Sequence, residues 1–195
     1  MNKLYFKYGA MGSSKTAQAL MCRFNYVQKG FNVLLAKPSI DTRSSKVKSR
    51  IGLEADCETF SKNENLIDFF ENFNKKQKID VFIIDEAQFM TKEQVNELKE
   101  ISLNIPVLCY GLLTNFKTEL FEGSKRLVEL SDSLMEIKSV CRCGRKATVN
   151  ARFVNGKITT TGEEVSIGAD EMYEGMCYNC FKKELNNSRG KKWNY

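Results

Sequence analysis

The chain has 195 residues and a mass of 22.3 kDa, with 42% hydrophobic and 28% charged residues. This is enough apolar material for one medium domain, or for one domain with a small satellite, and it excludes a short disulfide scaffold or a disordered polyelectrolyte. The net charge is +6, but residues 181–195 account for +4 of it, so the rest of the chain is close to neutral and no specific nucleic-acid partner is expected.

The sequence also indicates the localisation of the protein and the redox state of its cysteines. No apolar run approaches the ~18 residues of a membrane-spanning helix, and the N-terminus leads directly into a strand-like stretch. We therefore expect a soluble, cytoplasmic protein without a membrane partner. Seven cysteines, four of them in two close pairs, suit a reducing compartment with a metal site. The absence of histidine excludes His-based catalysis.

The first elements are a strand, a glycine-containing turn and a helix. Residues 4–8 predict the strand, and residues 15–29 predict the helix, with Ala19, Leu20 and Val27 on its inner side. Residues 33–36 give a second short strand. The polar stretch 39–50 has no core-forming periodicity and predicts a loop.

Two helices further along carry capping signals. Ser61 with Glu64 forms a capping-box pattern ahead of an apolar helix whose phenylalanines, Phe69, Phe70 and Phe73, we assign to the core. Thr91 with Gln94 forms a second box, which opens a helix through residue 101.

Apolar runs at 81–84 and 105–110 predict buried strands, and residues 121–130 predict a short helix. The alternation predicts an α/β fold with a mostly parallel sheet flanked by helices over residues 1–138. From residue 139 the pattern changes to paired cysteines with little helical periodicity. We therefore expect a small second domain at 139–185 and a polar basic tail at 186–195.

The segment after the first strand carries the first chemical signal. It fits the G-x-x-x-x-G-K-[ST] phosphate-binding loop except that Ser14 replaces the second glycine. Backbone amides, a helix N-terminus, an ammonium and a hydroxyl together neutralise a nucleotide tail and its Mg²⁺. The expected ATP-binding residues of this loop are Gly9, Ala10, Met11, Gly12, Ser13, Ser14, Lys15 and Thr16.

The second signal is a buried strand that ends in two carboxylates, Asp85 and Glu86. Such a strand delivers an aspartate to the Mg²⁺ of a phosphate-loop enzyme, so we expect Thr16 and Asp85 to hold the metal. Glu86 would then face the phosphoryl acceptor as a general base.

The third signal is the pair of motifs Cys141-x-Cys143 and Cys177-x-x-Cys180. Four cysteines so grouped favour a closed, structural Zn²⁺ site. The other three cysteines stand singly and are interpreted as incidental.

Together these features resemble the type II thymidine kinase family. The matching segments cover nearly the whole chain in order. They are the phosphate loop, Asp41-Thr42-Arg43, Ser49-Arg50-Ile51-Gly52, Ile84 to Phe89, Val107 to Leu112, Cys141 to Arg145, and Ile167-Gly168 followed by Tyr173 and Cys177.

The resemblance implies transfer of the ATP γ-phosphate to the 5′-hydroxyl of thymidine, or of deoxyuridine, in nucleotide salvage. It implies Mg²⁺ and structural Zn²⁺, a homotetramer and feedback inhibition by dTTP. It adds Ala87 and Gln88 to Asp85 and Glu86 as ATP-binding residues. It also implies a lasso between the cysteine pairs that closes over the base.

For the substrate site, the resemblance places Asp41 on the Mg²⁺ side and Arg43 near the transferring phosphate. Backbone groups near the lasso would read the base edge, and apolar side chains would hold the ring. The implied substrate-binding residues are Met11, Asp41, Arg43, Phe89, Leu112, Phe116, Phe121, Asn150, Ser166, Ile167, Gly168 and Tyr173.

Two other functions fit parts of the sequence. A nucleic-acid-dependent phosphate-loop ATPase would use the cysteine cluster and the basic tail to hold a polynucleotide, although the near-neutral body argues against it. A nucleotide-binding or zinc-module adaptor without turnover rests only on Ser14.

Overall fold

The computed structural model describes residues 3–39, 46–162 and 171–188. It confirms the α/β architecture. The central sheet has six strands in the order β5-β2-β6-β7-β1-β8, and every pairing in it is parallel. Its strands are β1 (Leu4–Tyr8), β2 (Val33–Pro38), β5 (Glu58–Phe60), β6 (Val81–Ile84), β7 (Val107–Gly111) and β8 (Ser133–Glu136).

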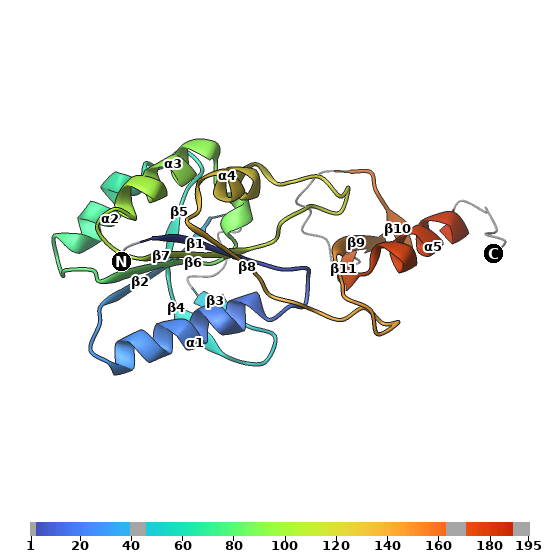
Figure 1. Cartoon of the computed structure of the whole chain (residues 1–195), viewed down its shortest axis with the longest axis horizontal. Helices are drawn as coiled ribbons and strands as arrows, with labels where there is room; N and C mark the ends of the chain where they lie inside the picture. The colour runs from blue at the N-terminus through green and yellow to red at the C-terminus, as the bar shows by residue number, and fades with distance from the viewer. Residues whose placement is uncertain (1–2, 40–45, 163–170, 189–195) are drawn as a thin grey trace.

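Helices cover both faces of this sheet (Figure 1). One face carries α2 (Leu66–Asn74), α3 (Lys92–Ile101) and α4 (Glu122–Leu130), and the other carries α1 (Lys15–Gln28). Two apolar clusters correspond to the two faces, and β6 is buried along its whole length between them. The continuous apolar run of β6 therefore follows from burial on both sides of a parallel sheet.

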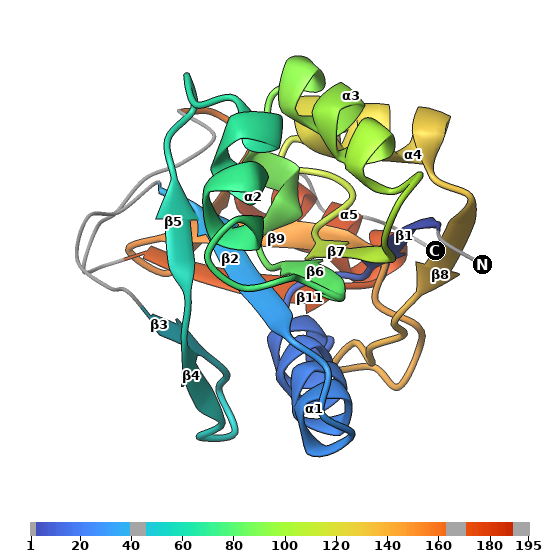
Figure 2. The same cartoon turned by 90° about the vertical axis from the view of Figure 1, so that its left-hand side faces the viewer.

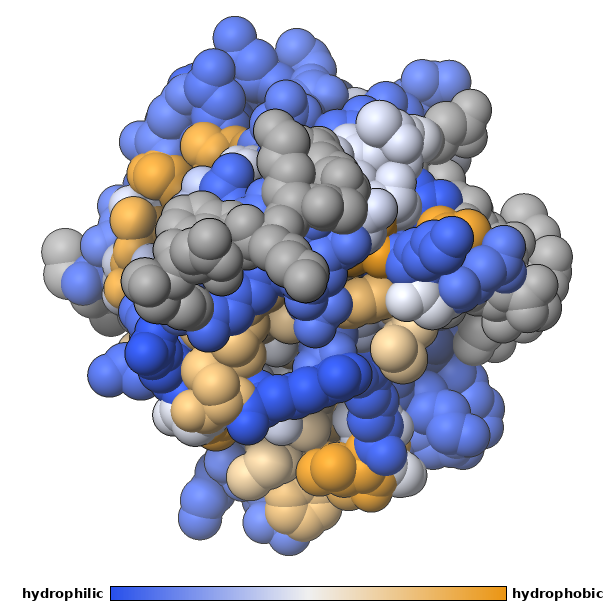
Figure 3. Space-filling view, turned by 90° about the vertical axis from the view of Figure 1, so that its right-hand side faces the viewer, coloured by the Kyte–Doolittle hydropathy of each residue, from blue (hydrophilic) through white to orange (hydrophobic). Residues whose placement is uncertain are grey.

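A smaller unit lies beyond the carboxyl ends of these strands (Figure 1). We call residues 139–162 and 171–188 the cysteine module. It contains the antiparallel strands β9 (Val149–Val154), β10 (Lys157–Thr159) and β11 (Glu171–Met176), followed by α5 (Tyr178–Ser188). The module has its own apolar cluster. Viewed from its end of the molecule, the surface is mainly hydrophilic, with separate small apolar groups (Figure 3).

The segment 39–50 is only partly a loop. Residues 40–45 lie outside the described part, but β3 (Lys46–Lys48) pairs with β4 (Glu54–Asp56) in a hairpin on the α1 side of the sheet (Figure 2). Val47 is buried in the cluster that α1 covers, which anchors the hairpin. One buried residue between exposed lysines is too weak a pattern to predict a strand.

Two helix predictions need correction. The 66–74 helix is capped by Asn65, whose side chain accepts from the Asp68 N–H at 2.9 Å, whereas Ser61 and Glu64 form a turn ahead of it. Val27 does not face the sheet, since it is 45% exposed. In contrast, the Thr91–Gln94 capping box has both of its hydrogen bonds, and Phe69 and Phe70 are buried while Phe73 packs against the same cluster.

The third correction concerns α5, which contradicts the expectation of little helical structure after residue 139. This helix is mostly polar, and its buried residues are Phe181 and Leu185. A single apolar pair at i, i+4 is too short a pattern to predict a helix from the sequence. It continues to Ser188, three residues past the expected end of the second domain at residue 185. None of the helices in the described segments is long and apolar enough to cross a membrane.

Candidate active site and metal centre

The phosphate-binding loop joins β1 to α1 and closes around the Lys15 ammonium. Lys15 Nζ donates to the carbonyl oxygens of Gly9 and Ala10, at 3.1 and 2.8 Å, and lies 3.2 Å from Ser13 Oγ. Burial lowers the pKa of Lys15 to about 8, against the opposing charges of Glu86 and Asp85. Ser14 has φ 61°, a left-handed conformation that favours glycine.

A cavity of about 340 Å³ opens in front of this loop. The loop and the first residues of α1 form one wall, and the tip of the β3–β4 hairpin forms another. Glu86 and Leu112 complete its lining. The hairpin residues on this wall are Lys48, Ser49, Arg50 and Ile51.

Two carboxylates, Asp85 and Glu86, follow β6, and Glu86 lines the cavity. Asp85 is 3% exposed, and burial raises its pKa to about 7, with a further increase from Glu86. The neighbouring Thr16 hydroxyl opposes that shift of the pKa. Within the described residues, Asp85 Oδ1 is buried without a hydrogen-bond partner. A buried carboxylate oxygen and a threonine hydroxyl are oxygen ligands of the kind that a hard divalent cation prefers.

Glu86 adopts φ 52° and is held by Gln88. The Gln88 side-chain amide donates to Glu86 Oε2 at 2.6 Å, and its Oε1 accepts from the Leu112 N–H at 2.9 Å. Gly111 makes this contact possible, because a Cβ there would lie 2.7 Å from Gln88 Oε1. The carboxylate therefore has a fixed orientation at the carboxyl end of the sheet.

A second, mostly apolar cavity of about 200 Å³ lies on the other side of Glu86. Phe89 packs edge-on against Phe121, and Phe116 packs against Tyr173, at ring-centroid distances of 5.5 and 6.5 Å. All expected substrate-site residues in the described segments line this cavity: Met11, Phe89, Leu112, Phe116, Phe121, Asn150 and Tyr173. The others, Asp41, Arg43, Ser166, Ile167 and Gly168, lie outside the described residues.

Met11, Glu86 and Leu112 line both cavities, so the two open onto the same three residues. Residues that the sequence interpretation did not assign also line them. Lys48, Arg50 and Ile51 reach the first cavity from the hairpin, and Thr114 and Asn115 reach the second. The Ser49-to-Gly52 segment is part of the family resemblance, but the sequence did not indicate that it forms a hairpin tip beside the phosphate loop.

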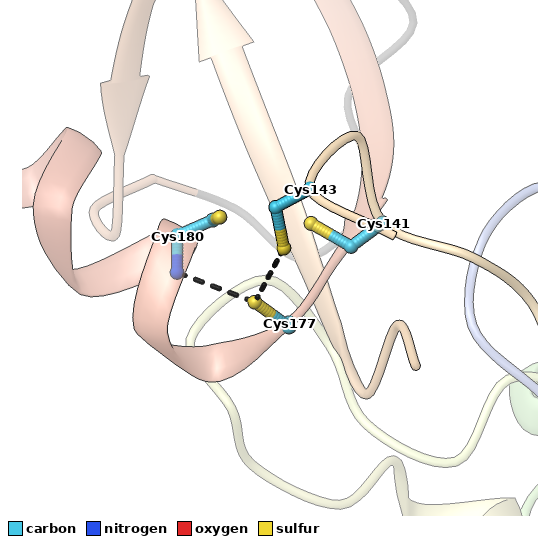
Figure 4. A group of neighbouring side chains, drawn as sticks. All are labelled: Cys141, Cys143, Cys177 and Cys180. Atoms are coloured by element: carbon cyan, nitrogen blue, oxygen red, sulfur yellow. Dashed lines mark hydrogen bonds between the residues drawn. The ribbon is translucent and has the colours of Figure 1, made fainter. Parts of the chain in front are cut away.

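The four cysteines of the two motifs come together in the cysteine module (Figure 4). Their sulfur atoms all lie within 4.8 Å of one another, and Cys143 Sγ is 3.6 Å from Cys177 Sγ. A tetrahedral zinc site with bonds of ~2.3 Å requires sulfur separations of roughly 3.8 Å. The Cys180 backbone N–H donates to Cys177 Sγ and holds the pKa of that thiol below its ordinary value, which favours a thiolate ligand. The cluster therefore fits Zn²⁺ with all four positions filled.

Comparison with known proteins agrees with this geometry. The family model for thymidine kinase matches residues 2–181. A thymidine kinase of Zymomonas mobilis is 46% identical over 191 residues, which cover 95% of this chain and 99% of the relative. The thymidine kinase of Shewanella oneidensis is 43% identical over 188 residues, covering 94% of this chain and 98% of the relative. That of Aliivibrio fischeri is 43% identical, covering 95% and 99%. This chain belongs to the thymidine kinase family.

Proposed function

We propose that this protein transfers the γ-phosphoryl group of ATP to the 5′-hydroxyl of thymidine, giving dTMP and ADP for nucleotide salvage. The observation that carries the proposal is the position of Glu86, which lines both the phosphate-loop cavity and the apolar cavity. A donor in the first and a nucleoside in the second would meet at this carboxylate. Holding both reactants in that geometry supplies a large part of the catalysis.

The triphosphate is held by the backbone amides of the phosphate loop, the N-terminus of α1 and Lys15. Lys15 now bonds the loop's own carbonyl groups, and the phosphate oxygens would replace these partners. Thr16 and the buried Asp85 carboxylate would hold Mg²⁺, as the phosphate-loop pattern implies. When bound, Mg²⁺ neutralises charge on the β- and γ-phosphates. Ala87 and Gln88, which follow the carboxylates, belong to the same nucleotide site.

Glu86 is the general base. It accepts the proton of the 5′-hydroxyl as that oxygen forms its bond to the γ-phosphorus, and the bond from this phosphorus to the β,γ-bridging oxygen breaks to release ADP. Proton transfer of this kind contributes ~10²- to 10⁴-fold. Gln88 keeps the carboxylate directed toward the meeting point of the two cavities.

The thymine ring lies among Met11, Leu112 and the aromatic side chains of the apolar cavity. From the family resemblance, we assign Asp41 to the Mg²⁺ side and Arg43 to the transferring phosphate. We assign recognition of the base edge to backbone groups of a lasso that includes Ser166, Ile167 and Gly168. A site that hydrogen-bonds the base edge strongly rejects bases with a different edge.

The cysteine cluster holds a structural Zn²⁺. Four thiolates leave no open position for catalysis, so the ion joins the two ends of the segment that forms the lasso. This connection limits the conformational entropy that the segment loses when it orders over the base, ~1–2 kcal/mol per residue.

The chain is also proposed to form a cytoplasmic homotetramer that is inhibited by dTTP. Support for assembly comes from the outer face of α1 and the residues after it, where four large apolar side chains are each about half exposed. They are Met21, Phe24, Val27 and Phe31. Exposed apolar side chains grouped in this way are a feature of interaction sites.

A nucleoside panel tests the proposed function. Purified protein with Mg²⁺-ATP should phosphorylate thymidine, and added polynucleotide should have no effect; deoxyuridine is included in the panel as a second possible substrate. Phosphorylation of deoxyadenosine but not thymidine would reject the assigned specificity. ATP hydrolysis that depends on a polynucleotide would instead favour the nucleic-acid-dependent ATPase.

A further inference from the structure

The cysteine module contacts the phosphate loop at Met11. Its backbone N–H donates to Asn150 Oδ1 at 2.7 Å, across 139 positions of sequence. The other end of the same side chain, Nδ2, donates to the Thr114 carbonyl oxygen at 2.6 Å. Asn150 is 3% exposed, so both ends of its amide are committed to the protein. Its side chain thus joins β9, the phosphate loop and the segment after β7.

The opposite side of Met11 is fixed by Gly175. In the β9–β11 ladder, Gly175 is the direct partner of Asn150. A Cβ at position 175 would lie 2.5 Å from the Met11 carbonyl oxygen and 3.3 Å from Ala10 Cβ. Approaches this close to backbone are possible only for glycine unless the loop shifts. One cross-strand pair of the module therefore sets both the N–H and the carbonyl side of Met11.

The contacts matter for nucleotide binding because Met11 directly precedes the amides that would surround the phosphates. Lys15 holds the inner side of the loop through the carbonyl groups of Gly9 and Ala10. On the outer side, the Asn150 amide holds the Met11 N–H. Amides that bind an anion must have their positions fixed in advance, since ordering them on binding lowers the affinity.

We propose that Asn150 and Gly175 are positioning residues that fix the phosphate loop through Met11, so that the cysteine module controls ATP binding as well as the nucleoside pocket. This inference deepens the proposed function and rests on it for the identity of the nucleotide. The role assigned to the Asn150 side chain is to hold the phosphate loop in position, although the residue also lines the apolar cavity.

The test is the affinity for a non-hydrolysable ATP analogue with Mg²⁺, measured by titration calorimetry without any nucleoside. Asn150→Ala leaves the Met11 N–H without its partner, and Gly175→Ala forces the Met11 carbonyl outward. Each is expected to weaken analogue binding by about tenfold. The matched control is Thr148→Ala, an exposed position two residues before Asn150, which should bind like wild type.

The outcomes separate three roles. If Asn150→Ala and Gly175→Ala bind the analogue as wild type does and only the KM for thymidine rises, the residues serve the nucleoside pocket alone and the inference is wrong. Urea unfolding of each variant detects general loss of structure. Should Asn150→Ala not fold, Gly175→Ala tests the inference by itself, since it displaces the Met11 carbonyl group without changing Asn150. Failure of the wild type to phosphorylate thymidine would reject the proposed function without affecting these binding measurements.

Discussion

Replacing Ser14 with glycine is expected to stabilise the protein. Ser14 has φ 61° and ψ 25°, its side chain makes no capping hydrogen bond, and it is exposed to solvent. A non-glycine residue in the left-handed region costs about 1–2 kcal/mol. Glycine removes this cost but increases the entropy of the unfolded chain by about 0.4–1 kcal/mol. The expected net gain is about 0.5–1 kcal/mol, or a rise in Tm of roughly 1–4 °C for a chain of this size.

Thermal unfolding of wild type, Ser14→Gly and Ser14→Ala measures this effect. Alanine keeps the left-handed strain and removes only the hydroxyl, so its Tm should stay within a degree or two of wild type. Because glycine reaches the same backbone conformation, the loop keeps its path and ATP affinity should change by less than about tenfold. A glycine variant that is less stable than wild type, or no more stable than the alanine variant, would refute the strain argument.

Three further predictions concern other parts of the molecule. Arg50→Ala should lower kcat/KM for ATP at least about tenfold, because Arg50 lines the phosphate-loop cavity. The control Lys46→Ala, on the same hairpin, should change kcat/KM less than twofold. Equal effects of the two substitutions would contradict a specific role for Arg50. Elemental analysis should find one zinc per chain and clearly less in Cys143→Ser, and an equal metal content would show that the cluster is not the site. The hydrogen bond from Lys99, with a second from the Leu4 N–H, holds the pKa of Asp132 below its usual range. The stabilisation by the Asp132 carboxylate is therefore present above about pH 4 and is lost as the pH falls through the lowered pKa. The difference in unfolding free energy between wild type and Asp132→Asn, measured with urea, should shrink between pH 6 and pH 2. A constant difference would be evidence against this linkage.

Much of the site was predictable because its signals are local. The phosphate loop, the carboxylates after β6 and the Thr91 capping box are each encoded within eight residues, and local geometry decides where they lie. The buried strand β6 is equally plain, since all four of its residues are apolar. The parallel sheet then brings these carboxyl ends together.

Features that depend on distant contacts were not predictable. The Asn150 amide bridges segments far apart in sequence, and no pattern around residue 150 indicates this role. Val27 has the spacing of an inner helix residue, but α1 presents it with other apolar side chains on the outer face. The β3–β4 hairpin is anchored by Val47, with Ala55 packed against the same apolar cluster. Two such residues among polar neighbours give no periodicity that distinguishes a hairpin from a loop.

The kinetics of Glu86→Gln test the central claim most directly. Glutamine preserves the shape of the side chain but cannot accept the proton of the 5′-hydroxyl. With thymidine and Mg²⁺-ATP, kcat should fall at least ~10²-fold, while calorimetric affinity for the ATP analogue stays within a fewfold of wild type. Turnover close to that of wild type would show that Glu86 is not the base and that the meeting point of the two cavities is not where the phosphoryl group is transferred.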